Sequence, residues 1–325
     1  MGRYPGTENE ECSVGLSETA RGNDGDAVAV DVGAKINPHL GVGPVRADGL
    51  HELTTVYQAV SLYDTVTVRP GKRGAGISLA IEGEGAGDLP TGEDNLAHKA
   101  AKLLALYANV EPDVDIHLRK RIPVAGGLAG GSADAAGSLV ACKRLWNVDI
   151  GREQLDQLAG GLGSDVPFCL YGGTAVGTGH GEKVEPLETQ ASYHWVVATS
   201  HTQISTPECY KEVDRLRENG IGRYSDDIRE LCRAYRDRAE PDELAHLLVN
   251  DMEAAAVSLR PDLASVMHGG LEEGALTAHV SGSGPTVLFL ARDAQHASAL
   301  ARRVKMRGGV RAVLTAQGPV AGPEA

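Results

Sequence analysis

A glycine-rich segment near the middle of the chain is the strongest constraint on the fold. Residues 123–136 read PVAGGLAGGSADAA, with the glycines in a GGxxGG spacing. An alternating apolar segment, Val114 to Leu118, precedes them and predicts a strand, and the Ala-rich segment Ser132 to Trp146 predicts a helix. Glycine lets the backbone turn tightly, and a helix start offers free N–H groups and a positive dipole end to phosphate. The segment predicts a phosphate-binding loop, and the simpler alternative is a tightly packed turn.

This loop differs from two common nucleotide-binding patterns. A Walker A loop ends in Gly-Lys-Ser/Thr, whereas here Gly131 directly precedes Ser132, and the spacing is not GxGxxG. The Ser132 hydroxyl is placed to contact a phosphate or a magnesium ion. We expect ATP, with Mg²⁺, as the ligand of the loop. The predicted ATP-binding residues are Pro123, Val124, Ala125, Gly126, Gly127, Leu128, Ala129, Gly130, Gly131, Ser132 and Ala133.

Composition and charge limit the classes of molecule that this chain is expected to bind. The net charge of −13 disfavours nucleic acid and anionic lipid, and no run of 18 apolar residues occurs, so we expect a small-molecule substrate and no membrane partner. The five cysteines form no CxxC pair, which argues against a zinc site. Their odd number, and the lack of a signal-peptide pattern, favour reduced thiols in the cytoplasm. The oligomeric state stays open.

Strand and helix patterns alternate without a regular βαβ rhythm, which favours an α+β fold. We expect two domains, 27–190 and 191–317, flanked by tails at 1–26 and 318–325 whose polar composition is typical of disorder. The predicted strands include Val28–Val32, Tyr63–Val68, His194–Ala198, Thr286–Leu290 and Arg311–Leu314. The other predicted helices are 95–109, 207–218 and 241–257.

Three further segments accompany the loop: GAKIN at 33–37 with ADGLHEL at 47–53, GSDVPF at 163–168, and SGSGPT at 281–286. In this order, over about residues 29–320, they resemble the GHMP kinase superfamily, and most of all its branch that acts on 4-diphosphocytidyl-2-C-methyl-D-erythritol. The resemblance implies two α+β domains with the active site in the cleft between them. It also implies phosphate transfer from ATP to the 2-hydroxyl of that substrate, a step of the non-mevalonate route to isoprenoid precursors.

The resemblance assigns catalytic roles to two residues. Asp165 matches the family's catalytic aspartate, which would accept the proton of the hydroxyl, and Lys35 matches its catalytic lysine. A lysine charge would keep the carboxylate ionised and favour the developing alkoxide. The alternatives are a helix or turn cap for Asp165 and a solvated strand-end side chain for Lys35.

Four residues are expected to bind the substrate. Asn37 shares a strand face with the lysine at position 35 and would orient the substrate or the aspartate, unless it only caps a turn. By resemblance, His51 reads the cytosine edge, and Thr206 and Tyr210 form the second domain's edge of the pocket. Tyr210 is expected to stack on the base. The alternatives are a surface histidine and a tyrosine that only packs on its helix.

Two departures from the family pattern bear on substrate recognition. Leu50 stands where the family usually has a tyrosine that stacks on cytosine, and Pro38 and His39 follow AKIN in place of bulky apolar residues. Homoserine or mevalonate kinase activity, or ATP binding without turnover, are the competing hypotheses. The glycines of 177–181 (GTGHG) are interpreted as a turn that connects two strands.

Overall fold

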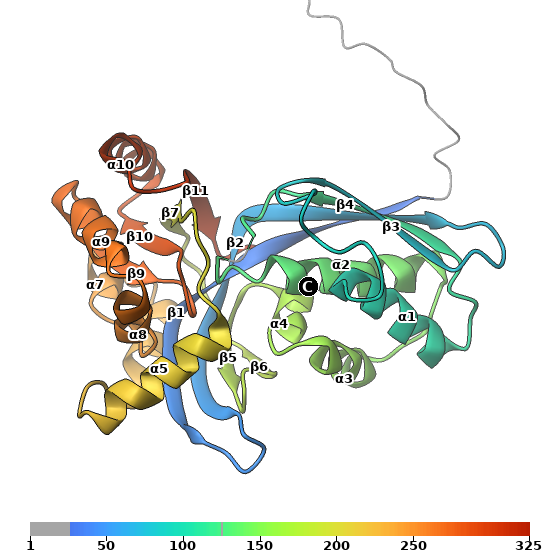
Figure 1. The fold of residues 1–325 in the computed structure, drawn as a ribbon, viewed down its shortest axis with the longest axis horizontal. Coiled ribbons are helices and arrows are strands. Elements are labelled where there is room, and N and C mark those ends of the chain that lie inside the picture. Colours follow the sequence, from blue (N-terminus) through green and yellow to red (C-terminus); the bar gives the residue numbers. More distant parts are fainter. Residues whose placement is uncertain (1–26, 125) are drawn as a thin grey trace, which may run out of the picture.

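The computed structural model describes residues 27–124 and 126–325, which form two packed units of sheet and helix (Figure 1). One sheet has seven strands in the order β3-β4-β2-β1-β8, with β5 paired to β2 and β6 to β5. The other has four strands in the order β11-β7-β10-β9. Because helices and mostly antiparallel strands mix in both, the predicted α+β class is confirmed.

The first unit is the seven-stranded sheet with four helices on one face. Its strands are β1 (Val28–Val45), β2 (His51–Pro70), β3 (Ile77–Gly83), β4 (Val114–Lys120), β5 (Thr174–Thr178), β6 (Lys183–Pro186) and β8 (Val249–Asn250). Its helices are α1 (Leu96–Ala108), α2 (Gly130–Leu145), α3 (Arg152–Leu162) and α4 (Val166–Tyr171). Helix α2 packs against β1 and β2, and its Ala-rich face lets it lie close to them. Helix α1 begins as predicted, with the Asn95 side chain accepting from the Ala97 N–H at 2.8 Å.

The second unit places helices on the smaller sheet. Its strands are β7 (Tyr193–Thr199), β9 (Thr277–Val280), β10 (Val287–Ala291) and β11 (Ala312–Gly318). Its helices are α5 (Thr206–Glu218), α6 (Arg229–Arg236), α7 (Pro241–Ala245), α8 (Glu253–Leu259), α9 (Asp262–Glu272) and α10 (Ala294–Arg307). Trp195 and Val197 of β7 belong to one core, and Val196 and Ala198 belong to the other. Both faces of this strand are therefore buried, which explains its continuous apolar run.

The long hairpin β1–β2 connects the two units (Figure 1). Val32 and Ile36 of β1 lie in the first core, whereas Leu40 and Val42 lie in the second. The change of core falls where the register of the hairpin shifts, between Ile36 and His39. The residues between the two cores are therefore held at the junction of the units.

Two sequence-based expectations are wrong. The predicted helix 241–257 is broken into α7, β8 and α8, because β8 pairs in parallel with β1 and the Asn250 amide donates to the carbonyls of Val280 and Gly282 at 2.8 Å. Residues 318–325, which we expected to form a tail, pack on the first unit instead. The Gly322 N–H donates to Tyr171 O at 2.8 Å, and Glu324 pairs with Lys143 at 2.6 Å.

The expected N-terminal tail at 1–26 lies outside the described residues. Within the described ranges, no helix combines the length and apolar character that crossing a membrane requires. The chain passes from the larger sheet to the smaller between Pro186 and Tyr193, close to the expected domain boundary at 190.

Candidate functional site

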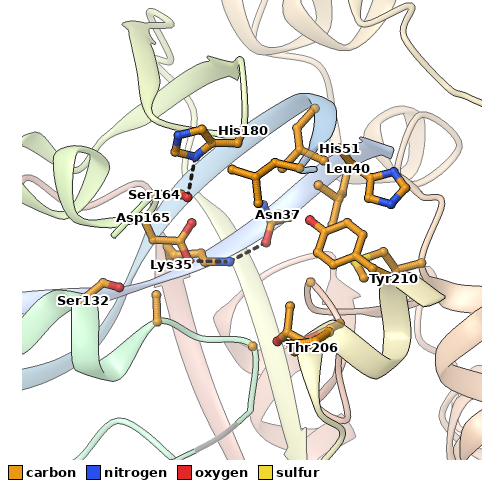
Figure 2. Close-up of a pocket in the computed structure, with 18 of the residues that line it drawn as sticks. Lys35, Asn37, Leu40, His51, Ser132, Ser164, Asp165, His180, Thr206 and Tyr210 are labelled. Carbon is orange, nitrogen blue, oxygen red and sulfur yellow. Dashed lines mark hydrogen bonds and ion pairs between the residues drawn. The ribbon is translucent and has the colours of Figure 1, made fainter. Parts of the chain in front are cut away.

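A cavity of about 800 Å³ lies where the two units meet, and most of the predicted site residues line it (Figure 2). The predicted residues on its wall are Lys35, Asn37, His51, Pro123, Gly126, Gly127, Ala129, Gly130, Gly131, Ser132, Asp165, Thr206 and Tyr210. Leu128 and Ala133 are buried in the first core instead. Val124 lines a smaller neighbouring cavity, and Ala125 lies outside the described residues.

Lys35 and Asn37 project from β1 into this cavity. The Lys35 side chain is only 7% exposed, and its ammonium donates to Asn37 Oδ1 at 2.8 Å. The Asn37 amide in turn donates to Thr55 Oγ1 at 2.9 Å, and that hydroxyl donates to His39 O at 2.6 Å. Lys35 is therefore not a solvated strand-end lysine, and Asn37 does not act only as a turn cap. The chain of hydrogen bonds holds the ammonium in one position.

Asp165 precedes α4 and faces the lysine across the cavity wall. Its Oδ2 lies 3.4 Å from the Lys35 ammonium, and its side chain is 28% exposed. Although it stands at the N-cap position, within the described structure its side chain makes no capping hydrogen bond to α4. Burial, together with the charge of Asp165 and a hydrogen bond to it, raises the pKa of Tyr57 well above its usual value. The carboxylate therefore stays available on the cavity wall beside the Lys35 ammonium and is not used to cap the helix.

Within the described residues, the glycine loop leads into α2 without a side-chain cap. The helix begins at Gly130, two residues before the predicted start, and Ala129 at its N-cap has φ +58°. The first intrahelical bond runs from Ala133 N–H to Ala129 O at 2.9 Å. The N–H groups of Gly130, Gly131 and Ser132 therefore lack carbonyl partners within the helix and lie on the cavity wall. Backbone donors at the positive end of a helix form an anion site.

The loop is fitted tightly against the second unit. Gly127 has φ +73°, and a Cβ there would lie 2.1 Å from Ser281 O. The Ser281 hydroxyl donates to Gly127 O at 3.2 Å. The neighbouring Ser283 lines the cavity and lies 2.9 Å from the Thr206 hydroxyl at the start of α5. The SGSG segment therefore joins both the loop and the predicted substrate edge.

A buried ion cluster, which the sequence did not indicate, lies behind the loop. The Lys120 ammonium contacts the carboxylates of Asp64 and Asp134 and lies 3.3 Å from Gly130 O. All three charged side chains are nearly inaccessible, and burial raises the pKa of Asp134 to about 7. Lys120 and Asp134 also line the smaller cavity, of about 170 Å³, which shares Gly130 and Gly131 with the main one. The cluster anchors the start of α2 between the two cavities.

The predicted base-binding residues contact each other. The rings of His51 and Tyr210 are stacked, with centroids 4.9 Å apart and an interplanar angle of 12°. His51 is buried rather than a surface histidine, and its Nδ1 donates to Gly43 O at 2.9 Å. Its Nε2 lies 3.4 Å from Asp214 Oδ2. The ring therefore has only Nε2 left for a base, not the free donor and acceptor pair that we expected.

Ser164 and His180 are among the residues of the cavity wall that were not predicted as site residues. Ser164 immediately precedes Asp165, and its hydroxyl lies 2.8 Å from Nδ1 of His180 (Figure 2). His180 belongs to the turn between β5 and β6, which confirms the interpretation of 177–181 as a strand-connecting turn. The glycine pattern indicated the turn, but gave no signal that its histidine would reach the cavity.

Comparison with known proteins agrees with this architecture. The model of the GHMP kinases N terminal domain matches residues 95–173, and that of the GHMP kinases C terminal matches residues 227–308. A 4-diphosphocytidyl-2-C-methyl-D-erythritol kinase of Salinispora arenicola is 50% identical over 297 residues, which cover 90% of this chain and 92% of the relative. The enzyme of the same name from Mycobacterium tuberculosis is 48% identical over 300 residues, or 91% of this chain and 92% of the relative.

Solved structures extend the comparison. A crystal structure of 4-(cytidine 5'-diphospho)-2C-methyl-D-erythritol kinase matches with a TM-score of 0.74 at 31% identity, covering 90% of this chain and all of that one. Homoserine kinase from Cytophaga hutchinsonii matches with a TM-score of 0.71 at 18% identity, covering 95% of this chain and 99% of that one, and shows the fold alone. The chain therefore belongs to the GHMP kinases and, within them, to the 4-diphosphocytidyl-2-C-methyl-D-erythritol kinase family.

Proposed function

We propose that this chain transfers the γ-phosphate of ATP to the 2-hydroxyl of 4-diphosphocytidyl-2-C-methyl-D-erythritol. The observation that carries the proposal is the position of the Lys35–Asp165 pair, 3.4 Å apart, on the same cavity wall as the uncapped start of α2. One cavity then holds both a carboxylate that can accept a proton and an anion site that can bind phosphate. The names of relatives that are about 50% identical support the choice of acceptor.

Asp165 is proposed to accept the proton of the 2-hydroxyl while the hydroxyl oxygen attacks the γ-phosphorus of ATP. The bond from that phosphorus to the β,γ-bridging oxygen breaks, and ADP leaves. A tertiary hydroxyl is a weak nucleophile, and a positioned base raises its reactivity. Lys35 is proposed to stabilise the developing negative charge, and Asn37 keeps its ammonium in place through the 2.8 Å hydrogen bond. Because Lys35 is buried, its charge is poorly screened by solvent and acts strongly at short range.

The N–H groups at the start of α2 are proposed to hold the phosphates of ATP. Gly130 and Gly131 border both cavities, so the nucleoside of ATP is assigned to the smaller one, beside Lys120. Phosphoryl transfer depends mainly on such positioning and charge stabilisation.

Mg²⁺ fits this site as an ion held chiefly by phosphate oxygens. The described residues contain no cluster of three or more His, Cys, Asp or Glu side chains suited to a metal, and Mg²⁺ in kinases is commonly bound by substrate phosphates and few protein oxygens. The Ser132 hydroxyl, in the first turn of α2, is the proposed protein ligand. When bound, the ion would neutralise charge on the phosphates.

The test is ADP release by the purified protein with a panel of alcohols. The cytidylyl substrate should give one ADP per acceptor consumed, and homoserine and mevalonate should give none above background. The Asp165→Asn variant serves as the inactive control. Faster turnover of homoserine or mevalonate would contradict the proposed acceptor, and ATP binding without turnover of any alcohol would contradict the kinase activity itself.

A further inference from the structure

The turn between β5 and β6 brings an imidazole to the wall of the catalytic cavity. His180 lines the same cavity as Asp165, and its side chain is 29% exposed (Figure 2). Its Nδ1 lies 2.8 Å from the hydroxyl of Ser164, the residue directly before Asp165. The ring is therefore bonded to the neighbour of the carboxylate that we assign to the reacting hydroxyl.

Contacts on both sides of the turn fix the position of this ring. Gly179 and Gly181 have φ of +74° and +102°, which favour glycine. A Cβ on Gly181 would lie 2.4 Å from the Tyr57 hydroxyl, and one on Gly179 would lie 2.6 Å from the Glu182 carboxylate. The Tyr57 hydroxyl also donates to Gly181 O at 3.3 Å. The turn is thus built against Tyr57, which itself neighbours Asp165.

The groups around His180 decide what its free nitrogen can bind. The Glu182 carboxylate accepts from the His180 backbone N–H at 2.7 Å and lies 3.5 Å from its Nδ1. A carboxylate at that distance favours the tautomer with the proton on Nδ1, which then donates to the Ser164 hydroxyl. Nε2 keeps its lone pair, and no residue of the described structure makes a hydrogen bond to it. This nitrogen suits a hydroxyl donor, whereas the nearby carboxylate would repel a phosphate.

We propose that His180 is a specificity-determining residue whose Nε2 accepts a hydrogen bond from a non-reacting hydroxyl of the acceptor's polyol part. The inference rests on the proposed function, because the reacting hydroxyl at Asp165 places the other hydroxyls of the same polyol beside it. A hydrogen bond there fixes the polyol so that only one hydroxyl faces the carboxylate. An apolar side chain at this position would leave that hydroxyl without a partner.

The experiment compares steady-state kinetics of the wild type, His180→Asn and His180→Leu. Asn keeps a short donor toward Ser164 but cannot reach as far as Nε2, and Leu removes both nitrogens at similar volume. Both variants should raise KM for the acceptor by about 3- to 10-fold, as expected for one lost hydrogen bond, with KM for ATP unchanged. The matched control is His268→Leu on α9, whose side chain is 74% exposed and is not among the residues that line the cavity. It should change neither constant.

An acceptor analogue that lacks one non-reacting hydroxyl identifies the contact. For the analogue that lacks the hydroxyl bound by His180, the KM of the wild type should rise by about the same factor. The KM of His180→Asn should be the same for this analogue as for the full acceptor, because the variant has already lost the contact. If the wild type fails to phosphorylate the acceptor, the proposed function fails. If the wild type is active but both variants keep its acceptor KM, only the role of His180 is refuted. Equal rises in KM for ATP and acceptor, with a lowered melting temperature, would show a structural role and overturn the inference.

Discussion

Replacing Asp165 by Asn removes one charge from the catalytic cavity while keeping the shape of the side chain. The side chain is 28% exposed, and in the described structure it makes no capping hydrogen bond to α4. A partly exposed ion pair contributes about 1 kcal/mol or less, so the free energy of unfolding should change by no more than that. The Lys35 ammonium loses its ion-pair partner but keeps its 2.8 Å hydrogen bond to Asn37. The variant should therefore fold and bind nucleotide.

Its turnover should fall sharply. Loss of a general base costs about 10²–10⁴-fold in rate, which corresponds to about 2.7–5.4 kcal/mol in the activation barrier. The assay is kcat from ADP release, with ADP affinity measured by calorimetry on the same sample. Asp262→Asn, at a surface pair with Arg260, is the matched control and should keep full activity. A folded Asp165→Asn variant with kcat close to that of the wild type would refute the base assignment.

Three further changes test other parts of the site. In Gly131→Val the new Cβ meets, within the described structure, only Leu96 at 3.7 Å, so the fold should hold. ATP affinity measured by calorimetry should fall at least about tenfold, a loss of about 1.4 kcal/mol. Unchanged affinity would argue against phosphate at this helix start. Burial raises the pKa of Asp134 from its usual 3.8 to about 7, so the stability that its protonated form contributes is present below about pH 4 and is lost as the pH rises through 7. The Asp134→Asn variant stays neutral, so its melting temperature relative to the wild type should rise across that interval, and parallel pH curves would contradict the burial argument. Leu50 lines the cavity and is 47% exposed. Leu50→Tyr should therefore add an aromatic face for the base and lower the acceptor KM by about fivefold, a gain of about 1 kcal/mol. An unaltered KM for both cytidylyl and uridylyl substrates would show that no base binds there.

Local patterns predicted those parts of the fold that depend on nearby residues. The helix 95–109 was recognisable because its apolar residues repeat at helical spacing, and the structure shows that Asn95 caps it. The segment 241–257 also has helical composition, but pairing of β8 with β1 and the hydrogen bonds of Asn250 interrupt it. The C-terminal residues look polar and mobile in composition, yet Glu324 pairs with Lys143, 181 positions earlier in the chain. Long-range contacts of this kind leave no local pattern.

In the site, too, sequence motifs predicted some residues, whereas long-range packing placed others. Motif resemblance indicated Lys35, Asp165 and the glycine loop, and the fold brings them to one cavity. It could not indicate that α2 begins at Gly130 rather than at Ser132, because the left-handed backbone of Ala129 before it depends on how the loop packs. His180 reaches the cavity only through the pairing of β5 with β2 and β6, which no spacing in the sequence records.

The most direct test of the central claim is the position of the new phosphate in the product. The purified protein, ATP, Mg²⁺ and 4-diphosphocytidyl-2-C-methyl-D-erythritol would be followed by phosphorus NMR without proton decoupling. Because the carbon that bears the 2-hydroxyl carries no proton, phosphate on that oxygen should give a new monoester signal that is not split, in step with ADP formation. A signal split by carbinol protons would place the phosphate on another hydroxyl, and ADP formation without a new monoester would show ATP hydrolysis instead of transfer; either result would contradict the proposed function.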